Sequence, residues 1–194
     1  MGAAYQSKYY ARITHSGTAL DDHPRPLQHA NMPNRPETIP MDNNQLLLTL
    51  RNALAMDNDD IAATFDLTGH QPDKAELAGM LSEREAADCT ACSDQVMRFF
   101  LEGLILSERG PREDGVTPAI EDDVLSNNQI LKKLRIAFNF KEMDMLSIFE
   151  EGGANLSVSE FKALFRKEEN KHFRPCSDAL LQQFLAGLTP TLDE

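Results

Sequence analysis

An internal repeat constrains the fold of this chain more than any other feature of its sequence. The segment NNQLLLTLRNAL, which begins at Asn43, returns as NNQILKKLRIAF at Asn127. The segment CSDQVMRFFLEGL, which begins at Cys92, returns as CSDALLQQFLAGL at Cys176. The offset is 84 residues in both cases, and 19 of the 62 positions aligned between them are identical. The chain therefore contains two repeats of one folding unit, whose aligned positions can be compared directly.

Apolar side chains that both repeats retain recur with the period of a helix. They fall at i, i+1, i+4, i+7 and i+8 from Leu46 and Ile130, and at i, i+1, i+4, i+5 and i+8 from Val96 and Leu180. No segment alternates in polarity as a strand does over a useful length. We therefore predict an all-α fold of two tandem homologous four-helix units related by pseudo-symmetry. The helices are expected over residues 43–56, 59–68, 73–82 and 93–107, and over 127–140, 142–151, 157–167 and 177–188.

Residues that begin and end helices recur in both repeats. The first and third helices are each preceded by a capping residue, with Gln or Glu three positions later; these are Asp42, Ser126, Asp73 and Ser157. Gly69 and Gly153 follow the second helix, where a left-handed residue can close it. Gly103 and Gly187 instead lie inside the apolar stripe of the last helix, where glycine costs about 0.5–1 kcal/mol against alanine. We predict that another helix backbone approaches closely there.

Composition divides the chain into four parts. Residues 1–40 are rich in proline and histidine, show no helical or alternating period, and are expected to be a disordered tail. An alternative is that this tail is not native and that Met41 is the natural start. The repeats are assigned to residues 41–110 and 125–194, and the segment 111–124 between them is an acidic linker punctuated by glycine and proline.

The charge of the chain disfavours some classes of partner. Its formal net charge is −12, which repels phosphate backbones at long range. The excess acid lies in the first repeat and the linker, whereas the second repeat is close to neutral. No apolar run approaches the roughly 20 residues of a membrane span, and the N-terminus lacks the apolar core of a secretion signal. The three cysteines do not suit a disulfide scaffold, so a reducing cytoplasm is the expected location.

Cys89 and Cys92 form a C-x-x-C motif, which is typical of zinc sites and dithiol redox centres. The second repeat keeps Cys176 at the position of Cys92 but has Phe173 at the position of Cys89, so the shared motif is Cys-Ser-Asp. We therefore predict no metal, cofactor or dithiol site. The shared cysteine precedes the last helix of each repeat, where the helix N-terminus could lower its pKa and make it a reactive thiol. The alternative, which we favour, is a buried cysteine beside a helix cap.

Four charged residues also occupy aligned positions. Asp94 and Asp178 follow the shared Cys-Ser, and Arg51 and Arg135 lie beside the apolar stripe of the first helix. An ion pair between the arginine and the aspartate is the structural expectation for each repeat. The alternative is that the arginine holds an anionic ligand, because a guanidinium matches carboxylate and phosphate geometry. The candidate site residues are thus Cys92, Asp94, Cys176, Asp178, Arg51 and Arg135.

From Met41 the chain resembles the YehS-like family of small bacterial proteins of unknown function. The resemblance rests on the Asn-Asn openings of both repeats and on the segments LKKLRIAF (131–138), FRKEENKHFRPCSD (165–178) and FLAGL (184–188). It implies two tandem copies of an all-α unit in a cytoplasmic bacterial protein, and it implies no activity. The first forty residues lie outside the usual extent of the family. The first repeat departs from the family pattern, with LLLTLRNAL and CTACSD in place of more basic segments.

Three functions remain open. The first, which we favour, is a non-catalytic protein-interaction or regulatory module that binds an unidentified protein partner or self-associates, because no catalytic motif stands out. The second is DNA or RNA binding through a hairpin like a helix–turn–helix over residues 142–151 and 157–167, which the net charge disfavours. Its candidate contacts are Lys132, Lys133, Lys162, Arg166 and Lys167. The third is a thiol-based sensor built on Cys92 and Cys176.

Overall fold

A computed structural model describes the part of the chain that carries the two repeats. The described residues are 41–83, 85–111, 120 and 124–188. They form eight α-helices and no strand, which confirms the all-α prediction for this part. The predicted tail and most of the predicted linker lie outside the described residues.

Each repeat contributes four helices. The first repeat supplies α2 (Asn43–Ala53), α3 (Asn58–Asp66), α4 (Lys74–Met80) and α5 (Asp94–Arg109). The second repeat supplies α6 (Asn127–Ala137), α7 (Glu142–Glu151), α8 (Val158–Leu164) and α9 (Asp178–Leu188). Every helix begins and ends within three residues of its predicted bounds. None of the described helices is both long and apolar enough to cross a bilayer.

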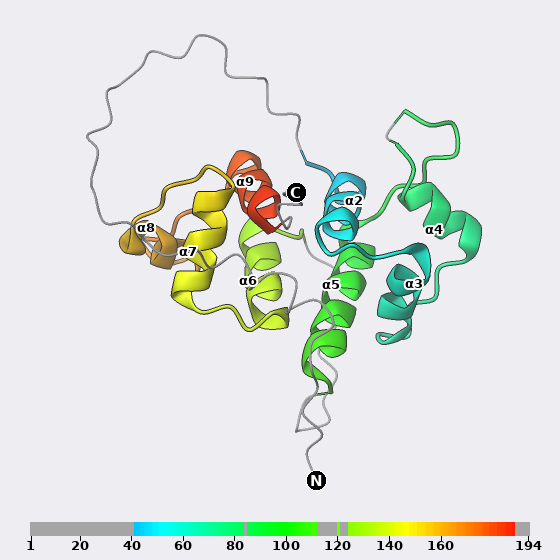
Figure 1. The fold of residues 1–194 in the computed structure, drawn as a ribbon, viewed down its shortest axis with the longest axis horizontal. Coiled ribbons are helices and arrows are strands. Elements are labelled where there is room, and N and C mark those ends of the chain that lie inside the picture. The colour runs from blue at the N-terminus through cyan, green and yellow to red at the C-terminus, as the bar shows by residue number, and fades with distance from the viewer. Residues whose placement is uncertain (1–40, 84, 112–119, 121–123, 189–194) are drawn as a thin grey trace, which may run out of the picture.

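The first and last helices of each repeat form the centre of the molecule (Figure 1). α5 packs on α6, and α2 packs on α9. In both contacts the last helix of one repeat packs on the first helix of the other. The two contacts are therefore equivalent, as a pseudo-two-fold axis requires. α3 and α4 flank this centre on one side, and α7 and α8 flank it on the other (Figure 1). Aligned side chains such as Leu50 and Leu134, or Phe100 and Phe184, are all fully buried in one hydrophobic cluster.

Close backbone contacts between helices explain the glycines inside the last helix of each repeat. α3 packs on α5 and α7 packs on α9. A Cβ atom on Gly103 would lie 2.0 Å from the carbonyl oxygen of Thr64, and one on Gly187 would lie 1.9 Å from that of Ile148. No side chain fits at such distances, so the predicted close approach is confirmed in both repeats.

The first helix of each repeat is three residues shorter than predicted. The chain leaves the helix at Leu54 and Phe138, and the next residue takes a left-handed conformation, with φ of 49° at Ala55 and 55° at Asn139. The apolar period continues past this point because Leu54 and Phe138 still point into the core. Periodicity alone therefore could not show where the helix ends. Gly69 and Gly153 also have positive φ, as predicted.

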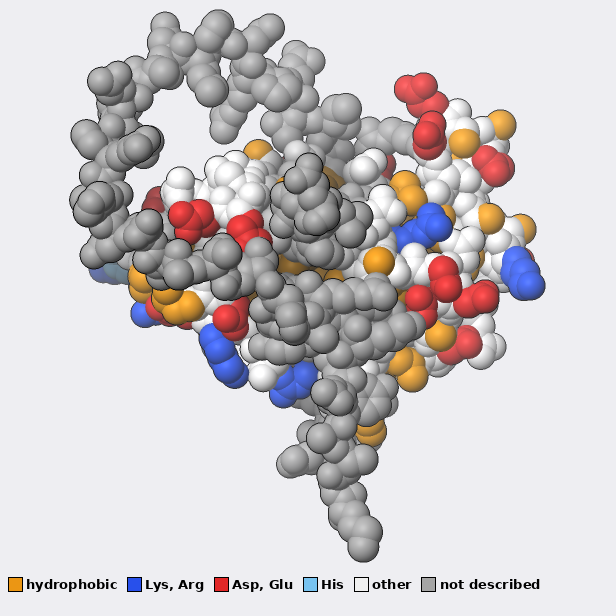
Figure 2. Space-filling view, in the orientation of Figure 1, with side chains coloured by type: hydrophobic (Ala, Val, Ile, Leu, Met, Phe, Trp, Pro, Cys, Tyr) orange, Lys and Arg blue, Asp and Glu red, His pale blue; other side chains and the backbone are white. Residues whose placement is uncertain are grey.

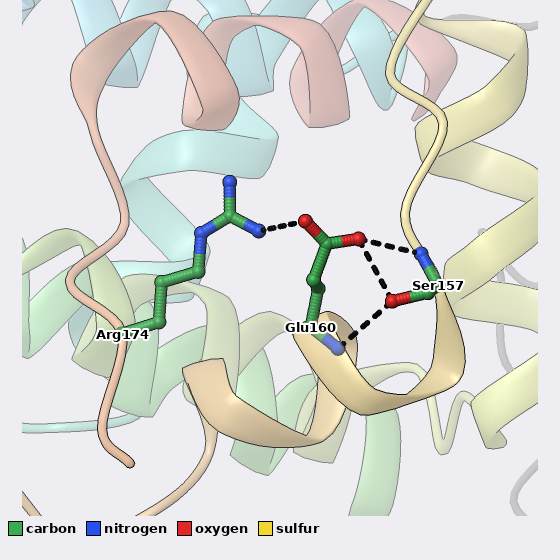
Figure 3. Close-up of polar contacts among 3 residues, drawn as sticks. All are labelled: Ser157, Glu160 and Arg174. Atoms are coloured by element: carbon green, nitrogen blue, oxygen red, sulfur yellow. Dashed lines mark hydrogen bonds and ion pairs between the residues drawn. The ribbon is translucent and has the colours of Figure 1, made fainter. Parts of the chain in front are cut away.

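The predicted helix caps are present, and Figure 3 shows the cap of α8. Ser157 Oγ accepts a hydrogen bond from the Glu160 N–H at 3.2 Å, and Glu160 Oε2 accepts one from the Ser157 N–H at 3.0 Å. Arg174 Nη1 donates to Glu160 Oε1 at 3.0 Å. The hydrogen bonds from Ser157, assisted by the charge of Arg174, lower the pKa of the Glu160 carboxyl. These bonds attach the segment before α9 to the first turn of α8.

A buried asparagine joins three segments in each repeat. Asn44 Nδ2 donates to the carbonyl oxygens of Met80 and Thr90, and its Oδ1 accepts from the Cys92 N–H. The second repeat reproduces all three bonds around Asn128, whose partners are Leu164, Arg174 and Cys176. The asparagine holds the end of the third helix and the start of the last helix against the first helix. The sequence match at this position therefore reflects a structural requirement.

Candidate functional site

The shared cysteines are buried beside helix caps. Cys92 and Cys176 are each 6% exposed, and Ser93 and Ser177 cap the helices that follow. Burial, followed by the nearby charges of Asp42 and Asp94, raises the pKa of the Cys92 thiol to about 12. Burial likewise raises the pKa of Cys176 to about 12. The helix N-terminus therefore does not produce a thiolate at neutral pH, and these thiols lack the low pKa that the sensor hypothesis requires.

The predicted ion pairs between aligned arginine and aspartate residues do not form. Asp94 instead accepts hydrogen bonds from Asn43 Nδ2 at 2.7 Å and from the Leu125 N–H at 2.9 Å. Asp178 accepts from Asn127 Nδ2 at 2.7 Å. The aspartates thus attach the last helix to the start of a first helix. In the first repeat, Asp94 also holds the chain where the second repeat begins.

The two aligned arginines differ in their surroundings. Arg135 lies over two aromatic rings, with its Cζ 5.0 Å from the Phe165 centroid and 5.5 Å from the Phe161 centroid. Its Nε donates to the carbonyl oxygen of Phe140 at 3.3 Å. In the first repeat, Leu77 and Leu81 occupy the positions aligned with these two rings. Among the described residues, the aromatic platform is therefore specific to Arg135, and Arg51 has no counterpart of it.

The lysines and arginine proposed to contact nucleic acid differ in their surroundings. Lys133 pairs with Glu102 across the contact between α5 and α6, and Lys162 pairs with Glu142 at 3.3 Å. Arg166 donates to the carbonyl oxygen of His172 at 3.2 Å, and Lys167 is exposed. Lys132 alone among these residues lines the groove described next.

An open groove of about 460 Å³ lies where the C-terminal end of α5 meets α6 and the turn before α7. Its lining combines positive charge with apolar and aromatic surface. The lining residues are Arg109, Lys132, Arg135, Ile136, Asn139, Phe140, Lys141 and Phe165. Four of these eight residues are cations and none is an acid. Arg109 comes from the first repeat and the others from the second, so the groove depends on the packing of α5 on α6.

The positive charge of the groove is not neutralised within the described part of the chain. None of the four lining cations pairs with a carboxylate there, whereas Lys133, Lys162 and Arg174 each pair with a glutamate. In Figure 2, acidic side chains predominate over the half of the molecule that contains α3 and α4. A concave cationic site on an acidic protein still attracts anions locally, because charges more than about 8 Å away are largely screened at physiological salt.

The aligned surface of the first repeat has a different chemistry. Lys132 is aligned with Leu48, and Lys141 is aligned with Asp57. The exposed Ile136 is aligned with Asn52. The arginine is therefore the one lining cation of the second repeat that the first repeat retains.

Sequence reasoning identified half of the groove's cations. Lys132 and Arg135 were candidates, and the alternative that Arg135 could hold an anion fits its position. Arg109 and Lys141 were missed because they come from the ends of helices that the sequence does not show to be neighbours. A comparison of charge at aligned positions could have revealed Lys141, because its counterpart carries the opposite charge.

Comparisons with known proteins agree with the duplicated fold. Residues 43–110 and residues 127–191 each match the family described as "Protein of unknown function (DUF1456)". The chain is also 36% identical to the "Uncharacterized protein YehS" of Escherichia coli (strain K12) over 146 residues, which make up 75% of this chain and 92% of that protein. No solved structure matches the chain. The resemblance expected from the sequence is thereby confirmed.

Proposed function

This chain belongs to the DUF1456 family, and we propose that it is a non-catalytic protein-interaction module that binds an acidic segment of a partner protein in the groove of its second repeat. The observation that carries this proposal is the convergence of four cations with no acidic neighbour in the lining. Such a site in an acidic protein offers local electrostatic complementarity to a short anionic segment. The first repeat then serves mainly as the support that contributes α5.

The lining favours binding over chemical turnover. It contains no histidine, cysteine, hydroxyl group or carboxylate to act as a nucleophile or general base, and Lys132 and Lys141 have no such group beside them in the lining to accept a proton from their ammonium groups. The buried thiols of Cys92 and Cys176 belong to helix caps and are absent from the lining. Three free cysteines also suit a reducing compartment, so we place the protein in the cytoplasm as part of this proposal.

An acidic protein segment fits the groove better than nucleic acid does. A long polyanion would experience the repulsion of the whole chain, which carries a net charge of −12. A short acidic segment would experience mainly the local field of the groove. Apolar and aromatic side chains also make up part of the lining, and a double helix, whose bases are stacked inside it, offers them little to pack against.

Fluorescence anisotropy of a labelled glutamate-rich peptide, titrated with the full chain at low salt, tests the proposal. We expect salt-sensitive binding that weakens several-fold, by about 1 kcal/mol, in Lys132→Leu, which installs the residue found in the first repeat. Lys171→Leu is the matched control, because it removes an exposed lysine outside the groove lining. If the peptide does not bind, or if both variants weaken binding equally, the proposal is wrong. Tighter binding of an oligonucleotide of equal charge would instead assign the groove to nucleic acid.

A further inference from the structure

We infer that the groove recognises a carboxylate and a bulky apolar side chain next to each other, so that its partner is an acidic segment containing a phenylalanine, leucine or similar residue. This inference rests on the proposed function and specifies the ligand of the same site. It assigns the carboxylate to Arg135, the apolar side chain to the surface around Ile136, and charge selection to Lys141. Each assignment follows from a separate observation.

Arg135 is prepared to bind a carboxylate before any ligand arrives. Two aromatic rings support its guanidinium, and the carbonyl oxygen of Phe140 accepts from its Nε. Its two Nη groups make no hydrogen bond or ion pair with the described residues, so they remain available at the groove. Because the side chain is already ordered, binding needs little further loss of conformational entropy. A planar guanidinium fork with free Nη groups is suited to a carboxylate, which it can bind through two parallel hydrogen bonds.

Exposed apolar surface lies beside this arginine. Ile136 is 44% exposed and follows Arg135 directly, and Phe165 is half-buried in the same lining. The first repeat has a polar residue, Asn52, at the position of Ile136. Exposed apolar side chains around a cationic centre add nothing to the binding of a bare anion, so they indicate a ligand that also carries an apolar group.

Lys141 occupies a position where a lysine is locally unfavourable. It is the N-cap of α7, and an ammonium group cannot accept hydrogen bonds from the free N–H groups of a helix start. Its positive charge also lies at the positive end of the helix dipole. Asp57, its counterpart in the first repeat, accepts a hydrogen bond from the Asp60 N–H at 2.8 Å. A residue that contradicts local preference in one repeat only is typical of a functional position.

Asn139, two residues earlier in the chain, orients the side chain of Lys141. Lys141 Nζ donates to Asn139 Oδ1 at 3.2 Å, and Asn139 itself has positive φ and lines the groove. The ammonium group is therefore held at the groove without a carboxylate to neutralise it among the described residues. It can select an anionic ligand over a neutral or cationic one.

Anisotropy titrations of the full chain with two peptides of equal length and charge test the inference. One peptide is glutamate-rich with a single phenylalanine, and the other has alanine in its place. We expect the phenylalanine peptide to bind about tenfold more tightly, since burying the ring contributes roughly 1.5 kcal/mol or more. Ile136→Asn, which installs the residue of the first repeat, should abolish this preference, so that the two peptides bind with equal affinity.

Two further variants separate the roles of the cations. Arg135→Lys keeps the charge but removes the planar fork, and should weaken binding of both peptides by about tenfold. Lys141→Asp should weaken both by a similar factor, whereas Lys74→Asp, which makes the same charge change in the first turn of α4, should have little effect. Thermal melting of each variant confirms that the fold is retained.

The outcomes distinguish this inference from the proposed function. Equal affinity for the two peptides, or an unchanged preference in Ile136→Asn, would overturn the inference and leave the interaction module intact. Binding of neither peptide would overturn both. Tighter binding of an oligodeoxythymidylate of equal charge would also overturn both, because the groove would then select phosphate.

Discussion

The two repeats agree in their interiors and differ in the surface around the turn between their first and second helices. Asn44 and Asn128 make the same three hydrogen bonds to aligned partners. The surface positions 48 and 57 carry leucine and aspartate in the first repeat, whereas the aligned positions 132 and 141 carry lysine. The comparison separates the buried residues that the fold requires from the surface residues that differ in the second repeat. The conserved set stabilises the unit, and the divergent set forms the groove.

Replacing the shared asparagines should cause the largest loss of stability. Asn44→Ala and Asn128→Ala each remove three hydrogen bonds and leave two carbonyl groups and one N–H without those partners. We expect each change to lower the free energy of unfolding by about 3–4 kcal/mol. The loss should be somewhat greater at Asn44, which is buried, than at Asn128, which is half-buried. Urea denaturation measures both, and a loss at only one of them would show that the repeats are not structurally equivalent.

Substituting the glycines inside α5 and α9 should have the next largest effect. Gly103→Ala and Gly187→Ala would place a methyl group about 2 Å from a backbone carbonyl oxygen of the neighbouring helix. We expect each to lower the free energy of unfolding by about 2–3 kcal/mol, because the helices must separate to accommodate it. Thermal or urea denaturation gives the value. A change below about 0.5 kcal/mol would mean that α3 or α7 can move away at little cost.

Alkaline pH should destabilise the protein through the two shared cysteines. Burial raises their pKa from 9.0 to about 12, so the unfolded chain loses these protons at a lower pH than the folded chain does. The free energy of unfolding should therefore fall as pH rises from about 9 towards 12, by about 2–3 kcal/mol near pH 10 for the two cysteines together. Urea denaturation across this range measures the slope. The double variant Cys92→Ala and Cys176→Ala should flatten it, and an unchanged slope would assign the effect to other groups.

Exchanging the N-cap residues Lys141 and Asp57 tests how much stability the protein loses by having a lysine at the groove. Lys141→Asp should raise the free energy of unfolding by about 1 kcal/mol, because aspartate caps α7 and complements its dipole. Asp57→Lys should lower it by a similar amount in the first repeat. Chemical denaturation of both variants provides the comparison. If Lys141→Asp destabilises the protein, the lysine has a structural role that its contacts do not reveal.

The smallest effect should come from the left-handed residue after the first helix. Ala55 and Asn139 have φ of 49° and 55°, and asparagine tolerates this conformation better than alanine does. Ala55→Asn should therefore raise the free energy of unfolding by about 0.5 kcal/mol. Asn139→Ala should lower it by a similar amount. Thermal denaturation of both variants checks the pair, and shifts in the same direction would contradict the explanation.

The sequence predicted the helices well because each repeat acts as a control for the other. The apolar positions shared by both repeats located all eight described helices, and the glycines inside the last helices predicted the close contacts at Gly103 and Gly187. The ends of α2 and α6 were misplaced because the residue that caps each helix remains buried. Local sequence signals do not distinguish a buried helical residue from a buried residue in a turn.

The candidate site was less predictable because it combines helix ends that are distant in the sequence. The expected pairing of Arg51 with Asp94 assumed that opposite charges meet, whereas Asp94 uses both oxygens on Asn43 and on the Leu125 N–H. Arg109 reaches the groove only because α5 packs on α6. This packing depends on tertiary structure, which the pattern of one helix does not encode.

The packing of α5 on α6 and of α2 on α9 also affects how the molecule unfolds. Because each repeat packs its terminal helices against those of the other, cutting the chain between them would uncover apolar surface on both fragments. We therefore expect that neither half folds alone and that melting is a single cooperative event. Such an arrangement allows one half to maintain the scaffold while the other accumulates residues, such as Lys141, that a solitary domain could less easily tolerate.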